Sequence, residues 1–145
     1  MSCPNFNGDV ATATGVPFED EGWQGSGTVL IVEDEETVRL TVEKILNALG
    51  FSVVLAVDGQ DGVVKFRDNP ENFRLVLLDF TMPKLDGVQV FEELRRISPA
   101  IRVVLMSGYG RQEATARFWG KGLDGFIAKP FDIHTLQSTL KAVLA

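Results

Sequence analysis

The chain has 145 residues, of which 45% are hydrophobic and 23% charged, a balance typical of one soluble globular domain. No apolar run is long enough for a transmembrane helix, and the N-terminus lacks the pattern of a secretory signal. A formal charge of −6 without a basic patch argues against nucleic-acid binding. The single cysteine, Cys3, cannot form an internal disulfide, so we expect a cytoplasmic location without membrane contact.

The first 27 residues differ from the rest in charge and pattern. They hold four acids and no Lys or Arg, which leaves sixteen acids and fourteen bases in residues 28–145. Gly, Pro, Thr and Asn are scattered through them without an apolar period. We therefore expect 1–27 to be a flexible tail or linker, hinged at 25–27, before a domain at 28–145.

From residue 28 onward, short apolar runs alternate with segments whose apolar residues recur at helical spacing. An apolar run such as TVLIV is typical of a parallel strand that is buried on both faces. The elements expected in the first half are, in chain order, a strand at 28–32, a helix at 35–49 that Gly50 ends, a strand at 51–57 and a helix at 59–69.

The second half of the chain continues this alternation. Its expected elements are a strand at 75–79, a helix at 87–97, a strand at 101–106, a weaker helix at about 111–120, a short strand at about 124–127 and a final helix at 132–144. Five strand-then-helix units predict an α/β fold with helices on both faces of a parallel sheet. Right-handed crossovers favour a flavodoxin-like doubly wound (βα)5 three-layer sandwich with strand order 2-1-3-4-5.

Polar side chains follow the strands at one edge of this predicted sheet. In such folds, ligands bind beyond the carboxyl ends of the strands, where the strand order reverses. That point lies between the first strand, followed by Glu33 and Asp34, and the third strand, which ends in Asp79. Ser107 follows the fourth strand and Lys129 the fifth. Three carboxylates, a hydroxyl and an amine are therefore expected on one rim.

Three carboxylates held a few ångströms apart repel one another and call for a compensating cation. Mg²⁺ suits a site with carboxylates, retained water and a phosphate oxygen. The same set suits phosphoryl transfer, in which catalysis consists mostly of positioning and charge neutralisation. A carboxylate such as Asp79 can act as nucleophile and form an acyl phosphate. Lys129 would offset the charge of one phosphoryl oxygen, and Ser107 would donate a hydrogen bond to another.

Four motifs, in order and suitably spaced, make residues 28–145 resemble the receiver domain of two-component response regulators. LIVEDEE resembles the acidic pair of that family, and LVLLDFTMPKLDG its phosphoacceptor strand and loop. VVLMSG resembles the segment of the switch hydroxyl, and GFIAKPF the lysine segment. The resemblance covers the whole predicted domain and leaves out only the tail.

The resemblance implies that Asp79 is the phosphorylated residue. Glu33 and Asp34 would hold Mg²⁺ together with Asp79, joined by the backbone carbonyl of Thr81. Catalysis would thus be limited to the chain's own phosphorylation and dephosphorylation, which makes it a signalling module and not an enzyme with turnover.

The resemblance also implies a switch and a backbone conformation. Ser107 and Lys129 would contact the phosphoryl group, and Phe126 would turn inward as Ser107 moves toward the phosphate. A cis bond between Lys129 and Pro130 is expected, as in many receivers of this type. The switched output surface would consist of the last two helices and the strand between them.

A few positions depart from the commonest receiver pattern. The first acid is Glu33, where Asp is frequent, and its longer arm would reach the metal through water. Phe126 lacks a hydroxyl and can switch only by packing. Thr81 and Tyr109 stand where the family tunes the lifetime of the phosphate, and shielding by Tyr109 predicts a lifetime of minutes or longer.

The expected partners are a histidine kinase or a histidine phosphotransfer protein, and a homodimer through the last two helices is a further expectation. The MSGYG segment and the long preceding tail resemble the C-terminal receivers of hybrid sensor kinases. This origin and a stand-alone regulator both stay open.

Two other functions compete with this interpretation. A haloacid-dehalogenase-like phosphatase also uses a strand-end aspartate, but it requires Asp-x-Asp after the first strand, where this chain has Glu33-Asp34-Glu35. A degenerate receiver that serves only as a binding surface is disfavoured because every key position is filled. Outside the motifs, we expect His134 on the surface, and one of Phe118 and Trp119 in the core.

Overall fold

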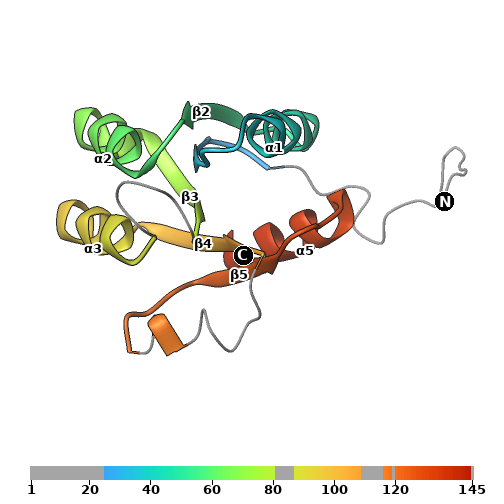
Figure 1. Cartoon of the computed structure of the whole chain (residues 1–145). Helices are drawn as coiled ribbons and strands as arrows, with labels where there is room; N and C mark the ends of the chain where they lie inside the picture. Colours follow the sequence, from blue (N-terminus) through green and yellow to red (C-terminus); the bar gives the residue numbers. More distant parts are fainter. Residues whose placement is uncertain (1–24, 81–86, 109–115, 119, 145) are drawn as a thin grey trace, which may run out of the picture.

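The structure, a computed structural model, describes residues 25–80, 87–108, 116–118 and 120–144. Within this part, strands and helices alternate along the chain (Figure 1). The elements are β1 (Thr28–Val32), α1 (Glu36–Ala48), β2 (Ser52–Ala56), α2 (Gly59–Asp68), a 3-10 helix (Pro70–Asn72), β3 (Phe73–Asp79), α3 (Gly87–Ile97), β4 (Arg102–Ser107), β5 (Gly125–Ala128) and α5 (Ile133–Leu144).

The strands form one parallel sheet in the order β2-β1-β3-β4-β5, which confirms the predicted fold class and strand order. Figure 1 shows the sheet between two layers of helices, with α1 and α5 on one face and α2 and α3 on the other. After β1 the chain forms β2 at one edge of the sheet and then crosses to β3 on the other side of β1. The strand order therefore reverses between β1 and β3.

Each face of the sheet carries its own buried apolar cluster, because successive strand residues point to opposite faces. Leu30, Val76 and Leu105 pack toward α2 and α3, where Phe66 is fully buried. Val29, Leu77 and Val104 pack toward α1 and α5. The strands are therefore apolar on both faces, as the runs in the sequence predicted.

Most predicted elements agree with the structure to within one or two residues at each end. The helix predicted at 111–120 lies largely outside the described residues, although residues 116 and 117 are helical. Phe118 is buried and packs edge-to-face on Phe91, with ring centroids 5.4 Å apart, whereas Trp119 lies outside the described residues. His134 is exposed, as expected.

Residues 25–27, predicted as a hinge, are hydrogen-bonded to the loops at the amino edge of the sheet. The Gly25 N–H donates to the Leu49 carbonyl (2.7 Å), and the Gly27 carbonyl accepts from the Ser52 N–H (2.9 Å). A Cβ at Gly25 would lie 2.1 Å from the Phe51 ring, so only glycine fits there. The residues before Gly25 lie outside the described part of the chain.

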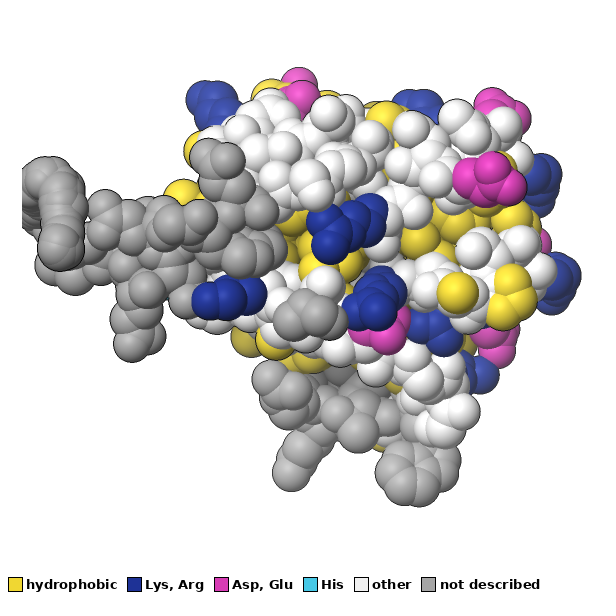
Figure 2. All heavy atoms as spheres, turned by 180° about the vertical axis from the view of Figure 1, so that it is seen from behind, with side chains coloured by type: hydrophobic (Ala, Val, Ile, Leu, Met, Phe, Trp, Pro, Cys, Tyr) yellow, Lys and Arg dark blue, Asp and Glu magenta, His cyan; other side chains and the backbone are white. Residues whose placement is uncertain are grey.

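The surface of the described part mixes residue types. Figure 2 shows acidic and basic side chains interspersed with apolar ones on one face of the molecule. Leu40, Val57 and Val64 are large apolar residues that stay exposed. None of the helices in the described ranges is both long and apolar enough to cross a membrane.

Helix α2 approaches β1 closely at Gly62, and this contact leads to a stability prediction. A Cβ at Gly62 would lie 2.8 Å from Cγ2 of the fully buried Val32. Gly→Ala in a helix normally stabilises by up to about 1 kcal/mol. Here overpacking should outweigh that gain, so we expect Gly62→Ala to lower the free energy of unfolding by about 1–2 kcal/mol in urea titrations.

Two controls separate this close contact from a general effect of added methyl groups. A Cβ at Gly108 would meet no atom of the described residues within 4 Å, so Gly108→Ala should be tolerated. In a Val32→Ala background, the penalty of Gly62→Ala should shrink, since the clashing methyl groups are gone. An equal penalty in both backgrounds would contradict the proposed contact.

Candidate functional site

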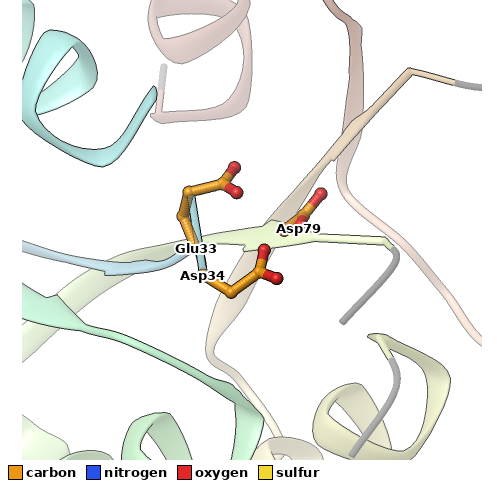
Figure 3. A group of neighbouring side chains, drawn as sticks. All are labelled: Glu33, Asp34 and Asp79. Atoms are coloured by element: carbon orange, nitrogen blue, oxygen red, sulfur yellow. The ribbon is translucent and has the colours of Figure 1, made fainter. Parts of the chain in front are cut away.

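The register of the parallel sheet brings the carboxyl ends of its central strands to one rim. Val32 at the end of β1 pairs with Leu78, so Glu33 and Asp34 follow directly beside Asp79 at the end of β3. Oxygens of the three carboxylates lie within 4.8 Å of one another. Figure 3 shows the Glu33 and Asp34 side chains leaving the end of β1 in different directions, with the Asp79 side chain close by at the end of β3.

Lys129, which follows β5, bridges two of these acids. Its Nζ lies 2.8 Å from Oε1 of Glu33 and 3.1 Å from Oδ1 of Asp79. The Glu33 side chain is 1% exposed and that of Asp79 7%, so both charges are largely removed from water. Such buried charges persist only when they are paired and hydrogen-bonded. The lysine therefore compensates part of the negative charge at the rim.

The turn from β1 into α1 is held by backbone and side-chain bonds. The Glu35 N–H donates to Oε2 of Glu33 (3.1 Å), which satisfies one free amide at the start of the helix. The Arg39 guanidinium donates to the carbonyls of Glu33 (2.9 Å) and Asp34 (3.4 Å). The sequence analysis did not identify Arg39. The only signal for it was its position in the first turns of a helix that begins with acidic residues.

The hydroxyl and the aromatic residue of the expected switch lie on β4 and β5, the two strands that follow β3 in the sheet. Ser107 ends β4 and is 1% exposed, and its carbonyl accepts a hydrogen bond from the Lys129 N–H (2.7 Å). Phe126 on β5 is partly buried and packs against the cluster under α2 and α3. The Lys129–Pro130 bond is cis, which confirms that expectation. Thr81 and Tyr109 lie outside the described residues.

Burial raises the pKa of Asp79 to about 7, and the negative charges of Glu33 and Asp34 act in the same direction. The Lys129 ammonium opposes them without cancelling them. Burial lowers the pKa of Lys129, but the hydrogen bond to Glu33 and the nearby Asp79 outweigh burial and raise it. Lys129 therefore stays charged, while Asp79 titrates near neutral pH when no cation is bound.

The carboxylate cluster has the chemistry of a site for a hard divalent cation. All its ligand atoms are oxygens, which Mg²⁺ prefers. Asp34 is exposed, and none of the described residues donates a hydrogen bond to its carboxylate. Burial raises the pKa of Asp79 most, and the charges of Glu33 and Asp34 raise it further against the opposing effect of Lys129. The residues present therefore fit such a cation.

The raised pKa of Asp79 predicts a pH dependence of stability. The unfolded carboxyl titrates near 3.8 and the folded one near 7, so the folded state binds more protons between these values. In metal-free buffer, the free energy of unfolding should therefore fall by about 1–3 kcal/mol as the pH rises from 5 to 8. Urea titrations at several pH values measure this fall.

Asp79→Asn provides the reference for this pH dependence, because it removes the titrating group and keeps the side-chain shape. The difference between wild type and Asp79→Asn removes contributions from groups that the substitution does not affect. We expect the variant to be more stable than wild type at pH 8 and close to it at pH 5. Parallel pH profiles of the two proteins would show that Asp79 does not titrate in this range.

Comparisons with known proteins agree with this geometry. Residues 29–141 match the response regulator receiver domain family. The chain is 33% identical to the chemotaxis protein CheY of Treponema pallidum, over 80% of this chain and 81% of that protein. It is 32% identical to the sensor kinase CckA of Brucella abortus, over 83% of this chain but only 13% of that protein.

Among solved structures, the chain resembles one in the CheX–CheY–BeF3–Mg complex of Borrelia burgdorferi. The TM-score is 0.78 at 29% identity, over 82% of this chain and 90% of that one. The chain thus spans nearly the whole of a CheY but a small fraction of the length of CckA. The match over most of the chain, the strand order and the acidic rim lead to one conclusion: the chain belongs to the response regulator receiver domain family.

Proposed function

We propose that this receiver domain takes a phosphoryl group onto Asp79 and thereby acts as a phosphorylation-dependent switch. The observation that carries the proposal is the position of the Lys129 ammonium, 3.1 Å from Oδ1 of Asp79 and 2.8 Å from Oε1 of Glu33. A buried carboxylate beside a fixed cation suits a nucleophile whose product carries additional negative charge. Receiver domains are signalling modules, and the family match favours this role over a phosphatase of the haloacid-dehalogenase type.

The donor would be a phosphohistidine of a histidine kinase or a phosphotransfer protein, the partners with which receivers interact. An Asp79 oxygen forms the new P–O bond as the P–N bond of the donor breaks, and the donor imidazole keeps the electron pair. Ionised Asp79 is required, and the pKa of about 7 leaves a substantial ionised fraction at neutral pH even without a cation. Lys129 and Ser107 would then contact oxygens of the bound phosphoryl group.

The acidic rim would hold Mg²⁺ for this reaction, with Glu33, Asp34 and Asp79 as the candidate side chains and the Thr81 carbonyl as a further ligand. Bound there, the ion would neutralise charge on the carboxylates and on the phosphoryl oxygens. The similar Borrelia burgdorferi protein was solved with BeF3 and Mg, which supports the same ligand chemistry here.

The response to phosphorylation would start at Ser107, which ends β4, and at Phe126, which lies on the adjacent strand β5 and pairs with Leu105. Phosphate would favour the form in which Ser107 approaches it and Phe126 packs inward, which shifts an existing two-state balance.

We further propose a cytoplasmic location, and a homodimer or partner contact through the last two helices and β5. The similarity to CckA makes it a candidate that this domain is the receiver of a hybrid sensor kinase. The presence of kinase motifs encoded upstream of Met1 would decide this question.

The central prediction is stoichiometric labelling of Asp79. Incubation with Mg²⁺ and acetyl phosphate should add one phosphoryl group to the wild type, as measured by intact-protein mass spectrometry. Asp79→Asn should stay unlabelled because it lacks the nucleophile. Asp132→Asn is a matched control, since Asp132 is an exposed acid that accepts the Thr135 N–H before α5. Labelling that survives in Asp79→Asn would refute Asp79 as the acceptor.

The lifetime of the phosphate tests the proposed role of Tyr109. With donor removed, the label on the wild type should persist for minutes or longer at neutral pH, because an aromatic side chain there would shield the acyl phosphate from water. Tyr109→Ala should shorten that lifetime without changing the labelled residue. Loss of the wild-type label within seconds would contradict the shielding role.

A further inference from the structure

One edge of the parallel sheet is formed by β2, which has a neighbouring strand on only one side among the described residues (Figure 1). In a strand, the N–H and C=O of one residue point to the same side, and those of the next residue point to the other side. The Ser52 N–H donates to the Gly27 carbonyl, so the backbone groups of Ser52 face β1. Alternation then turns those of Val53, Leu55 and Val57 outward, where an added strand would pair with them.

Two of these outward-facing groups are bound by side chains of α2. The Lys65 ammonium donates to the Leu55 carbonyl (2.6 Å), and Oδ2 of Asp61 accepts from the Val57 N–H (3.0 Å). The same Oδ2 lies 3.1 Å from Nζ of Lys65. The two side chains are one helical turn apart, so they lie next to each other on the same face of α2. The donor and the acceptor on the strand edge are therefore joined to each other as an ion pair.

This pair reproduces the hydrogen bonds of one residue in a further strand. In a regular parallel ladder, a residue donates its N–H to a carbonyl of the neighbouring strand. Its own carbonyl accepts the N–H that lies two positions later on that strand. The Leu55 carbonyl and the Val57 N–H have this spacing. The Lys65 ammonium occupies the place of the missing N–H, and the Asp61 carboxylate occupies the place of the missing carbonyl.

We propose that the Asp61–Lys65 pair closes the β2 edge against pairing with the β2 edge of a second copy of this chain. Two identical edges are self-complementary, because they can pair antiparallel about a two-fold axis. Such pairing uses the outward-facing groups of β2. With the Leu55 carbonyl occupied, Val53 alone among the described residues of β2 keeps both outward groups open. A single open residue is too little for a stable strand pair.

The residues around this edge would favour association if the pair were removed. The sequence of β2 is SVVLA, which contains no charge and no proline. Val57, directly after the strand, and Val64, between Asp61 and Lys65 on α2, are large apolar residues that stay exposed. Natural sheets protect such edges with charged side chains, lysine above all. Here the lysine comes from the covering helix and not from the strand itself.

The test removes the pair without changing the net charge. The variant Asp61→Ala/Lys65→Met loses one acid and one base, and its weight-average mass by sedimentation should rise at least about twofold above that of wild type as the concentration approaches the millimolar range. The control Glu36→Ala/Lys44→Met removes an exposed acid and an exposed lysine of α1 and leaves the α2 pair intact. Its mass should follow that of wild type.

Hydrogen exchange measured by NMR locates the contact. The outward-facing Val53 and Leu55 amides should exchange rapidly in the wild type and at least about tenfold more slowly in the associated double variant. The Val54 amide, which faces β1, is the internal reference. Adding Val53→Pro to the double variant should restore the wild-type mass, because it removes an outward N–H and no bond to β1. If the proline variant does not fold, the exchange measurement decides alone.

Two outcomes would overturn the inference. One is a double variant whose mass equals that of the α1 control at every concentration. The other is association without slower exchange at Val53 and Leu55, since the contact would then lie elsewhere on the molecule. Both readouts are independent of phosphoryl transfer, so they decide the role of the α2 pair whether or not Asp79 accepts phosphate.

Discussion

The arrangement of the rim depends on one buried interaction, the Lys129 ammonium shared by the carboxylates of Glu33 and Asp79. Two acids at this depth, with Asp34 beside them, would repel strongly in the low local dielectric of a protein interior. Lys129, directly after β5, opposes this repulsion, but burial and the neighbouring carboxylates together still raise the pKa of Asp79. The remaining negative charge makes the rim chemically suited to a further cation, and in the proposed function it would tie cation binding to the ionisation of Asp79.

The parallel sheet makes this interaction possible, because it delivers residues that are distant in sequence to the same edge. Glu33 and Lys129 are separated by 96 positions, yet both follow directly on strands whose carboxyl ends meet there. The strands are apolar on both faces and packed by helices, so their ends have little freedom to move. The rim is thus held by the core, while the loops that surround it are free to differ among receivers.

Local bonds at the β1–α1 turn and at the β4–β5 pair complete the support of the rim. Arg39 donates to the carbonyls of both acids, and the Glu35 N–H holds the Glu33 carboxylate. The Ser107 carbonyl accepts from the Lys129 N–H, so the backbones of the expected switch hydroxyl and of the lysine are joined directly. In the proposed switch, a displacement of Ser107 toward a phosphoryl group would therefore act directly on the segment that carries Lys129.

The order of elements, the strand order and the identity of the rim residues could be read from the sequence, because apolar periodicity and strand-end position are local properties of the chain. The docking of residues 25–27, the role of Arg39 and the pairing of Lys129 with Glu33 could not, since they depend on which atoms meet after folding. The sequence alone determined that three acids, a hydroxyl and a lysine share one edge. Only the tertiary structure decided that Glu33 is buried and Asp34 exposed, because these two neighbours along the chain come to lie in opposite environments once α1 packs on β1 and β2 and Lys129 meets Glu33.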